Sequence, residues 1–224
     1  MRSLDELLER DDPRWPEVQS WIAAATNQVE VLSPGDDRAA ALLATQVTTR
    51  SPLGAIIYET GGLLVDQGWL RILGAGCDRL PRSLPSWNRG CGTMVEESPS
   101  PYLLIADDAI GGFFAINGGA LGDDAGSLYY FAPDSLEWEP LDTGYTGFIN
   151  WALAGDLQDY YAELRWTGWE AEVQALPADR TINFYPFLWA KADSLESRNR
   201  ASVPVLESFN LQLGFAEQLG DRQA

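Results

Sequence analysis

The sequence predicts an α+β fold in which a mainly antiparallel sheet, arranged as a meander, packs against helices and carries an N-terminal helical extension. Three observations predict it. Apolar residues recur at helical spacing in the N-terminal quarter of the chain. Short apolar runs separated by Asp-Asp, Gly-Gly and Pro-Asp turns follow, and helical patterns return in the C-terminal third. This order of helices, strands and helices is typical of α+β domains.

The N-terminal segment is expected to form four helices and one short strand. Ser3 and Glu6 have capping-box spacing, in which each residue satisfies a free backbone amide of the other. Pro16 suits the first turn of the second helix, and Ser51 with Pro52 opens the fourth. The helices are expected at residues 4–12, 16–25, 39–44 and 51–59, and the strand at 29–32.

The middle of the chain is expected to form the sheet. Residues 63–65 and 69–73 flank Asp66-Gln67-Gly68, which is typical of a hairpin turn. Four further strands are expected at residues 102–106, 113–116, 127–131 and 136–141, in the order of an antiparallel meander. Residues 74–101 are rich in proline and glycine and are expected to form a long irregular loop.

The C-terminal third is expected to be mostly helical. Thr146 can cap a helix that carries an aromatic stripe and is interrupted at Gly155. The stripe consists of Phe148, Trp151, Leu157, Tyr160, Tyr161 and Leu164. Three later segments are a helix opened by the capping-box pair Thr167 and Glu170, a strand or packed loop at 185–189, and a strand or helix at 203–219.

No linker rich in glycine, serine or proline divides the chain, so we expect one α+β domain over residues 1–224. Its parts are an N-terminal helical extension (1–50), a core (51–190) and a C-terminal segment (191–224).

The sequence contains no histidine, which removes most common catalytic arrangements. Ser-His-Asp triads, Cys-His dyads and imidazole metal ligands all need it. No phosphate-binding loop or serine-hydrolase elbow is present either. Asp107 and Asp108 are sequence neighbours, so on a strand their side chains would point to opposite faces. We therefore expect no catalytic residue.

Charge is unevenly distributed along the chain. There are 33 acidic and 15 basic residues, a net charge of -18, and residues 90–164 hold 13 acids and no base. Such a field repels nucleic acid and anionic lipid and attracts basic partners. We expect no nucleic-acid or membrane binding, and a basic protein as partner. The alternative is that these carboxylates only keep the domain in solution.

Two cysteines and the N-terminus indicate the compartment. The first residues lack the apolar core of a signal peptide, and no apolar run is long enough to span a membrane, so a cytoplasmic location is expected. Cys77 and Cys91 are expected to be free thiols there, with a bridge across the loop as the alternative. Two cysteines fill only half of a zinc site, and we expect no metal or cofactor.

Two groups of residues are candidates for binding. The partner-binding candidates lie at turns of the acidic segment and are Asp107, Asp108, Asn117, Asp123, Asp124 and Glu139. The loop candidates are Arg79, Arg82, Trp87, Asn88 and Arg89.

Several runs of residues resemble a family. They are Ala106-Asp-Asp to Asn117-Gly-Gly, Tyr129-Tyr-Phe-Ala-Pro-Asp134, Leu136-Glu-Trp-Glu139, Tyr185-Pro-Phe-Leu-Trp189, Gly61-Gly-Leu-Leu-Val-Asp and Trp87-Asn88. Together they resemble a bacterial domain-of-unknown-function family, from about residue 51 onward, which implies no activity. The acidic turn, the strand Gly126-Ser-Leu-Tyr-Tyr-Phe131 and the helix that begins near Phe148 are similar to the layout of the SUKH superfamily. That resemblance implies a SUKH-like α+β fold and a role as an immunity protein that binds a toxin domain.

The sequence therefore predicts a non-enzymatic, acidic protein-binding module of immunity or regulatory type. One alternative is a carboxylate-dependent hydrolase, or a small-ligand binder, that uses residues 74–101 as a lid. Another is self-association into a homo-oligomer, with Arg71, Arg79, Arg82 and Arg89 pairing against the acidic segment of a second subunit.

Overall fold

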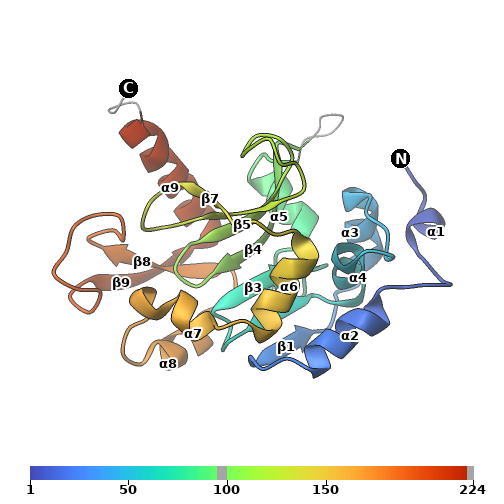
Figure 1. The fold of residues 1–224 in the computed structure, drawn as a ribbon, viewed down its shortest axis with the longest axis horizontal. Coiled ribbons are helices and arrows are strands. Elements are labelled where there is room, and N and C mark those ends of the chain that lie inside the picture. The colour runs from blue at the N-terminus through green and yellow to red at the C-terminus, as the bar shows by residue number, and fades with distance from the viewer. Residues whose placement is uncertain (95–99, 221–224) are drawn as a thin grey trace.

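The computed structural model describes residues 1–94 and 100–220, and its centre is a seven-stranded antiparallel sheet (Figure 1). The strands follow one another in space in the same order as in the chain, which is a meander. They are β1 (Val29–Leu32), β2 (Gly62–Val65), β3 (Leu70–Leu73), β4 (Tyr102–Asp108), β5 (Phe113–Asn117), β6 (Leu128–Phe131) and β7 (Trp138–Pro140). A separate two-stranded sheet pairs β8 (Arg180–Tyr185) with β9 (Asn199–Pro204). The predicted α+β class and the meander are confirmed.

The N-terminal segment contributes both helices and an edge strand. Its helices are α1 (Leu4–Leu7), α2 (Trp15–Ala23), α3 (Arg38–Thr45) and α4 (Pro52–Glu59). Ser3 donates from its backbone N–H and its hydroxyl to Glu6 Oε2, and Ser51 Oγ accepts from the N–H of Gly54, as the two caps predict. The first helix is shorter than predicted, because Leu8 is already extended. β1 pairs with β2, so this segment is part of the sheet.

The expected irregular loop at residues 74–101 contains a helix, and this part of the prediction is wrong. Residues 84–90 form α5 (Leu84–Gly90). Ser83 caps the helix, because its Oγ accepts from the N–H of Ser86 at 3.1 Å while Ser86 Oγ accepts from the N–H of Ser83. Pro85 fits the first turn, where no hydrogen bond is lost. Residues 95–99 of the expected loop lie outside the described residues.

The C-terminal third holds short helices and one long one. They are α6 (Tyr145–Ala154), α7 (Leu157–Tyr160), α8 (Trp169–Gln174) and α9 (Val205–Gly220), with a 3-10 turn at residues 162–164. Gly144, and not Thr146, is the N-cap of α6, and Gly168, in a left-handed conformation, takes the place of Thr167 at the N-cap of α8. The break at Gly155 is confirmed, since Asp156 caps a new helix there.

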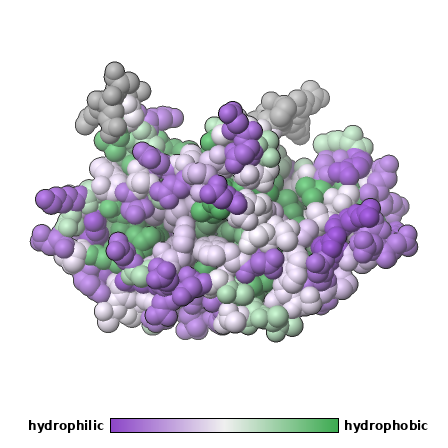
Figure 2. Space-filling model, in the orientation of Figure 1, coloured by the Kyte–Doolittle hydropathy of each residue, from purple (hydrophilic) through white to green (hydrophobic). Residues whose placement is uncertain are grey.

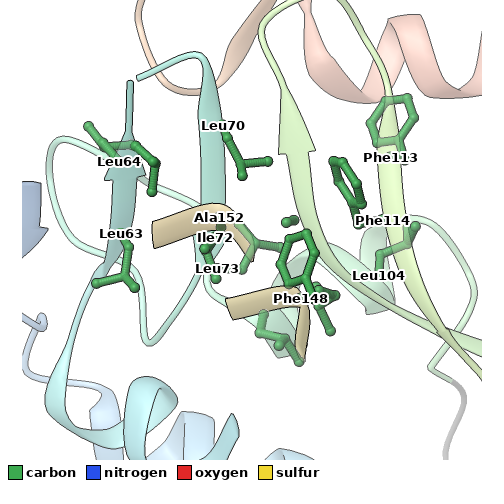
Figure 3. Close-up of a cluster of buried hydrophobic side chains, with 14 of the residues drawn as sticks. Leu63, Leu64, Leu70, Ile72, Leu73, Leu104, Phe113, Phe114, Phe148 and Ala152 are labelled. Atoms are coloured by element: carbon green, nitrogen blue, oxygen red, sulfur yellow. The ribbon is translucent and has the colours of Figure 1, made fainter. Parts of the chain in front are cut away.

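The core lies on both faces of the sheet, because side chains alternate along each strand. On one face, Phe114 packs against Phe148 of α6, with 4.9 Å between the two ring centroids. Phe113 points to the other face, where it contacts Phe209 of α9 and Trp87 of α5. In Figure 1, α6 crosses the face of the sheet that is turned toward the viewer. Figure 3 shows Phe148 and Ala152 of α6 lying over the strands.

The outer surface is mixed in character. Figure 2 shows patches of hydrophobic residues between hydrophilic ones on the viewed side of the molecule. No helix within residues 1–94 and 100–220 is both long and apolar enough to cross a membrane.

Candidate functional site

Asp107 lies at the centre of a buried ion-pair network. Its carboxylate is fully buried and lies 2.9 Å from Arg71 Nε and 2.7 Å from Arg82 Nη1. Both guanidinium groups also donate to the carbonyl oxygen of Ala178, which precedes β8. The network therefore ties the sheet to the segment that leads into the small second sheet. One carboxylate facing two buried guanidinium groups leaves this cluster with a net positive charge.

Asp108 is equally buried but is surrounded by neutral donors. Its Oδ1 accepts from the N–H groups of Ile110 (3.1 Å) and Gly112 (2.7 Å), and its Oδ2 from the hydroxyls of Tyr130 (2.7 Å) and Tyr161 (3.3 Å). Burial raises the pKa of the Asp108 carboxyl, and these hydrogen bonds oppose the rise. Asp107 and Asp108 thus have separate partners on opposite faces of the sheet, as their adjacency predicts.

Asn117 is also buried, where it shapes the turn that follows β5. Its Oδ1 accepts from the N–H groups of Gly119 and Leu121, and its Nδ2 donates to the carbonyl of Gly122. With Asp107 and Asp108 it is at most 2% exposed. These three partner-binding candidates are therefore parts of the interior, and their side chains are not on the surface that a partner would touch.

The other three partner-binding candidates are exposed. Asp123 lies at the tip of the turn after β5, and Glu139 lies on β7. Asp124 Oδ1 accepts from the hydroxyl of Tyr129 at 2.7 Å, and this hydrogen bond is the main reason that the pKa of Asp124 is lowered. The same bond raises the pKa of Tyr129, and the charges of Asp123 and Asp142 add to the rise. These carboxylates therefore lie close enough together to act on one phenol.

The loop candidates divide in the same way. Asn88 is fully buried and fastens α5 to β4, because its amide accepts from the N–H and donates to the carbonyl of Leu104. Trp87 is 4% exposed and packs on Phe113, while Arg82 belongs to the Asp107 network. These three support the core, so the part of the loop that contains them is packed against the sheet.

Arg79 and Arg89 are the exposed loop candidates, and the two cysteines lie near them in sequence. Arg79 pairs with Glu30 at 2.9 Å, and Arg89 lines a surface groove with Cys77. Both cysteines are free thiols, as expected. Burial raises the pKa of the Cys91 thiol to about 12, so it is a poor nucleophile.

Exposed carboxylates gather around the last strand of the sheet. We name the six that lie around β6 and β7 the acidic edge: Asp123, Asp124, Asp134, Glu137, Glu139 and Asp142. Asp156, Asp159 and Glu163 follow on and around α7. None of these nine carboxylates forms an ion pair with an arginine or lysine of the described residues.

An apolar hollow opens beside the acidic edge. It has a volume of about 330 Å³ and is lined by Leu141, Thr143, Gly147, Phe148, Trp151 and Tyr160, from the segment after β7 and from α6 and α7. We name it the aromatic hollow. Tyr160 is 40% exposed and meets Trp151 edge to face at 4.9 Å between centroids. Behind these rings lie Phe114 and Tyr130 of the sheet, so the wall of the hollow rests on the core.

The chain is irregular at Asp142, which lies in sequence between two residues that line the hollow. Two backbone hydrogen bonds of Leu128 flank Asp142. The N–H of Leu141 donates to the carbonyl of Leu128, and the N–H of Leu128 donates to the carbonyl of Thr143. Asp142 between them has a φ of 50° and is exposed. A bulge of this kind turns one side chain away from the sheet, and here it presents a carboxylate between two residues that line the hollow.

A larger polar cleft lies between the β2–β3 turn and the segments around α7 and α8. Its volume is about 770 Å³, and it is lined by Asp66, Asp156, Arg165, Glu170 and Glu196 among others. Asp66 forms an ion pair with Arg165, Asp156 caps α7, and Glu196 accepts from the N–H of Thr167 at 2.8 Å. Three of the four carboxylates therefore hold local structure together.

The aromatic hollow is the feature that sequence reasoning missed. The stripe from Phe148 to Leu164 predicted a core-facing helix, and Phe148 and Tyr161 are indeed buried. Tyr160 and Trp151 belong to the same stripe but line a surface hollow, because the chain breaks at Gly155 and changes direction. The available signal was that break, combined with adjacent tyrosines that cannot both face the core.

Comparison with known proteins places the chain among proteins without an assigned activity. A family model described as "Protein of unknown function DUF2625" matches residues 4–208. The chain is 44% identical over 218 residues to the putative uncharacterized protein YbfG of Escherichia coli K12, a match that covers 97% of this chain and 98% of the relative. It is 38% identical over 220 residues to an uncharacterized protein of Haemophilus influenzae, which covers 97% and 96% of the two chains.

Proposed function

The chain belongs to the DUF2625 family of proteins of unknown function, and we propose that it is a non-enzymatic protein-binding module whose acidic edge meets a basic partner. One observation carries the proposal. Nine exposed carboxylates between residues 123 and 163 have no ion-pair partner among the described residues. Unpaired like charges at close range repel one another, and a cationic surface relieves that repulsion while it steers association.

The hydrolase alternative has less support. It needs two carboxylates that converge across one cleft. The two fully buried carboxylates, Asp107 and Asp108, have separate partners on opposite faces of the sheet. Self-association through arginines also loses support, because Arg71 and Arg82 are buried against Asp107. A basic toxin domain, which the resemblance of the sequence to the SUKH superfamily implies, is one partner with the required charge.

Affinity capture with matched variants tests the proposal. The neutralised variant carries Asp134→Asn, Glu137→Gln, Glu139→Gln and Asp142→Asn. The control variant carries Asp11→Asn, Asp12→Asn, Asp193→Asn and Glu217→Gln, which removes the same charge at exposed sites elsewhere. Each protein is immobilised and exposed to lysate of a bacterium that carries the gene, at 50 and 300 mM NaCl.

We expect the wild type and the control to retain the same basic protein, more strongly at low salt because salt screens exposed charges. The neutralised variant should lose it. Retention of one protein set by all three baits, or of no protein at either salt concentration, contradicts the proposal.

A further inference from the structure

The aromatic hollow differs from the rest of the acidic edge because it can take an apolar group. Its six lining residues offer few polar atoms, the hydroxyls of Thr143 and Tyr160 among them, within about 330 Å³. That volume is at the small end of the range for ligand pockets. It is large enough for one bulky side chain and small for a nucleotide or another large cofactor.

The walls of the hollow are held in place before anything binds. Phe148 is 1% exposed and stacks obliquely on Phe114 and Trp151, at 4.9 and 5.9 Å between centroids. Tyr160 contacts Trp151, Tyr130 and Tyr161. Rings fixed in this way lose little freedom when a group enters, so burial of the incoming group is not offset by ordering of the pocket.

Carboxylates lie near this apolar site. Asp142 stands between two lining residues in sequence, and Asp159 precedes Tyr160. Burial is the main cause of the raised pKa of Tyr160, and the charges of nearby carboxylates add to it. These carboxylates are the buried Asp108 and the exposed Glu139 and Asp134. An apolar group that enters the hollow therefore arrives in a negative field.

The charge of the chain decides between occupants. A second copy also carries a net charge of -18 and would be repelled at this edge. A neutral apolar compound would fill the hollow but leave the carboxylates unpaired. A peptide segment with a large apolar side chain between lysines or arginines satisfies both features.

We infer that the aromatic hollow is the anchor pocket for such a segment: one large apolar side chain enters it while flanking cations pair with Asp134, Glu139, Asp142 and Asp159. This inference rests on the proposed function and names its docking site. Partner recognition then has two parts, a salt-sensitive charge contribution and a salt-resistant burial contribution.

Three fluorescein-labelled heptapeptides test the inference by fluorescence anisotropy. The first is Lys-Arg-Lys-Phe-Lys-Arg-Lys, the second has alanine in place of phenylalanine, and the third has serine and glutamine in place of every cation. On the wild type, the first should bind about 10- to 100-fold more tightly than the second, from burial of the ring. The third peptide should bind more weakly than the first. The difference between their affinities should be smaller at 300 mM NaCl, because salt screens the charges of the first peptide. These comparisons need no variant.

Two variants locate the contacts. Tyr160→Ala should weaken the phenylalanine peptide about tenfold and leave the alanine peptide unchanged. The neutralised variant of the acidic edge should weaken both basic peptides and keep their ratio; Asn suits the left-handed conformation of residue 142.

The outcomes separate the two proposals. Equal binding of the two basic peptides, with no effect of Tyr160→Ala, overturns the anchor pocket and leaves the acidic edge standing. Equal binding of the basic and the uncharged phenylalanine peptides overturns the requirement for flanking cations. If the neutralised variant binds both basic peptides as tightly as the wild type does, the proposed function itself is overturned.

Discussion

Asp107 and Asp108 are adjacent, equally buried and chemically identical, yet their replacement by asparagine should have very different effects. Asp107 faces two guanidinium groups at 2.9 and 2.7 Å, whose side chains are 2% and 11% exposed. Asp107→Asn removes the negative charge and leaves both cations buried. Breaking a buried ion pair from one side costs about 3–5 kcal/mol. For a chain of this length that corresponds to a fall in Tm of roughly 6–20 °C.

Asp108→Asn should cost about 1.5 kcal/mol or less. The amide oxygen can still accept from the N–H groups of Ile110 and Gly112, and the amide nitrogen can donate to the hydroxyls of Tyr130 and Tyr161, which rotate to accept. The substitution also removes the cost of burying a carboxylate, which is the main cause of its raised pKa.

Urea unfolding followed by tryptophan fluorescence measures both free energies of unfolding, with Asp123→Asn as an exposed control that should change stability by less than about 0.5 kcal/mol. The pH dependence gives a second readout. Because the folded pKa of Asp108 is raised, its contribution to stability is fully present below about pH 4 and is lost as pH rises through the folded pKa. The difference in the free energy of unfolding between wild type and Asp108→Asn should therefore decrease with rising pH. Equal losses for the two substitutions would refute this account of the networks.

Three further predictions concern packing and reactivity. Gly112→Ala should lower the free energy of unfolding by about 1–3 kcal/mol, because the added Cβ would lie 2.4 Å from Asp108 Oδ2 and closer still to the Tyr130 hydroxyl; urea unfolding checks this, and an unchanged midpoint would contradict it. Gly214→Ala should stabilise by about 0.5–1 kcal/mol in the same assay, since Gly214 lies inside α9 with open space around it. In native Cys77→Ser protein at pH 8, Cys91 should gain no iodoacetamide adduct by mass spectrometry, because burial raises its pKa to about 12; an adduct formed before unfolding would show that the thiol is accessible and reactive.

Local signals in the sequence were sufficient for most of the fold. Capping residues and turn residues act over a few positions, so Ser3 and Ser51 predicted where their helices begin, and Asp66-Gln67-Gly68 predicted the turn between β2 and β3. The helix at Leu84–Gly90 was missed because proline and glycine around it indicated a loop, although Ser83 and Pro85 are themselves helix-start signals. The meander order was predicted from short apolar runs separated by turn residues.

The candidate site was predictable only in part, because burial of a charge depends on distant partners. Asp107 and Asp108 are followed by a glycine-rich turn that is typical of the surface, and nothing local shows that Arg71 and Arg82 lie against Asp107. The concentration of acids was visible in sequence, and nine of them are exposed. Their position beside a hollow depends on the bulge at Asp142 and on the turn at Gly155, which are set by tertiary contacts.

The last strand of the sheet has a consequence for colloidal behaviour. β7 ends the strand order, and a terminal strand offers its free backbone groups to any other chain. Pro140 has no N–H to offer, Glu139 places charge on the same three-residue strand, and Glu137 lies directly before it. Proline and charge on a short terminal strand are devices that prevent strand addition and aggregation. The carboxylates proposed to attract a partner therefore also keep copies of the protein from joining sheet to sheet, and a variant that neutralises them should be handled at low concentration.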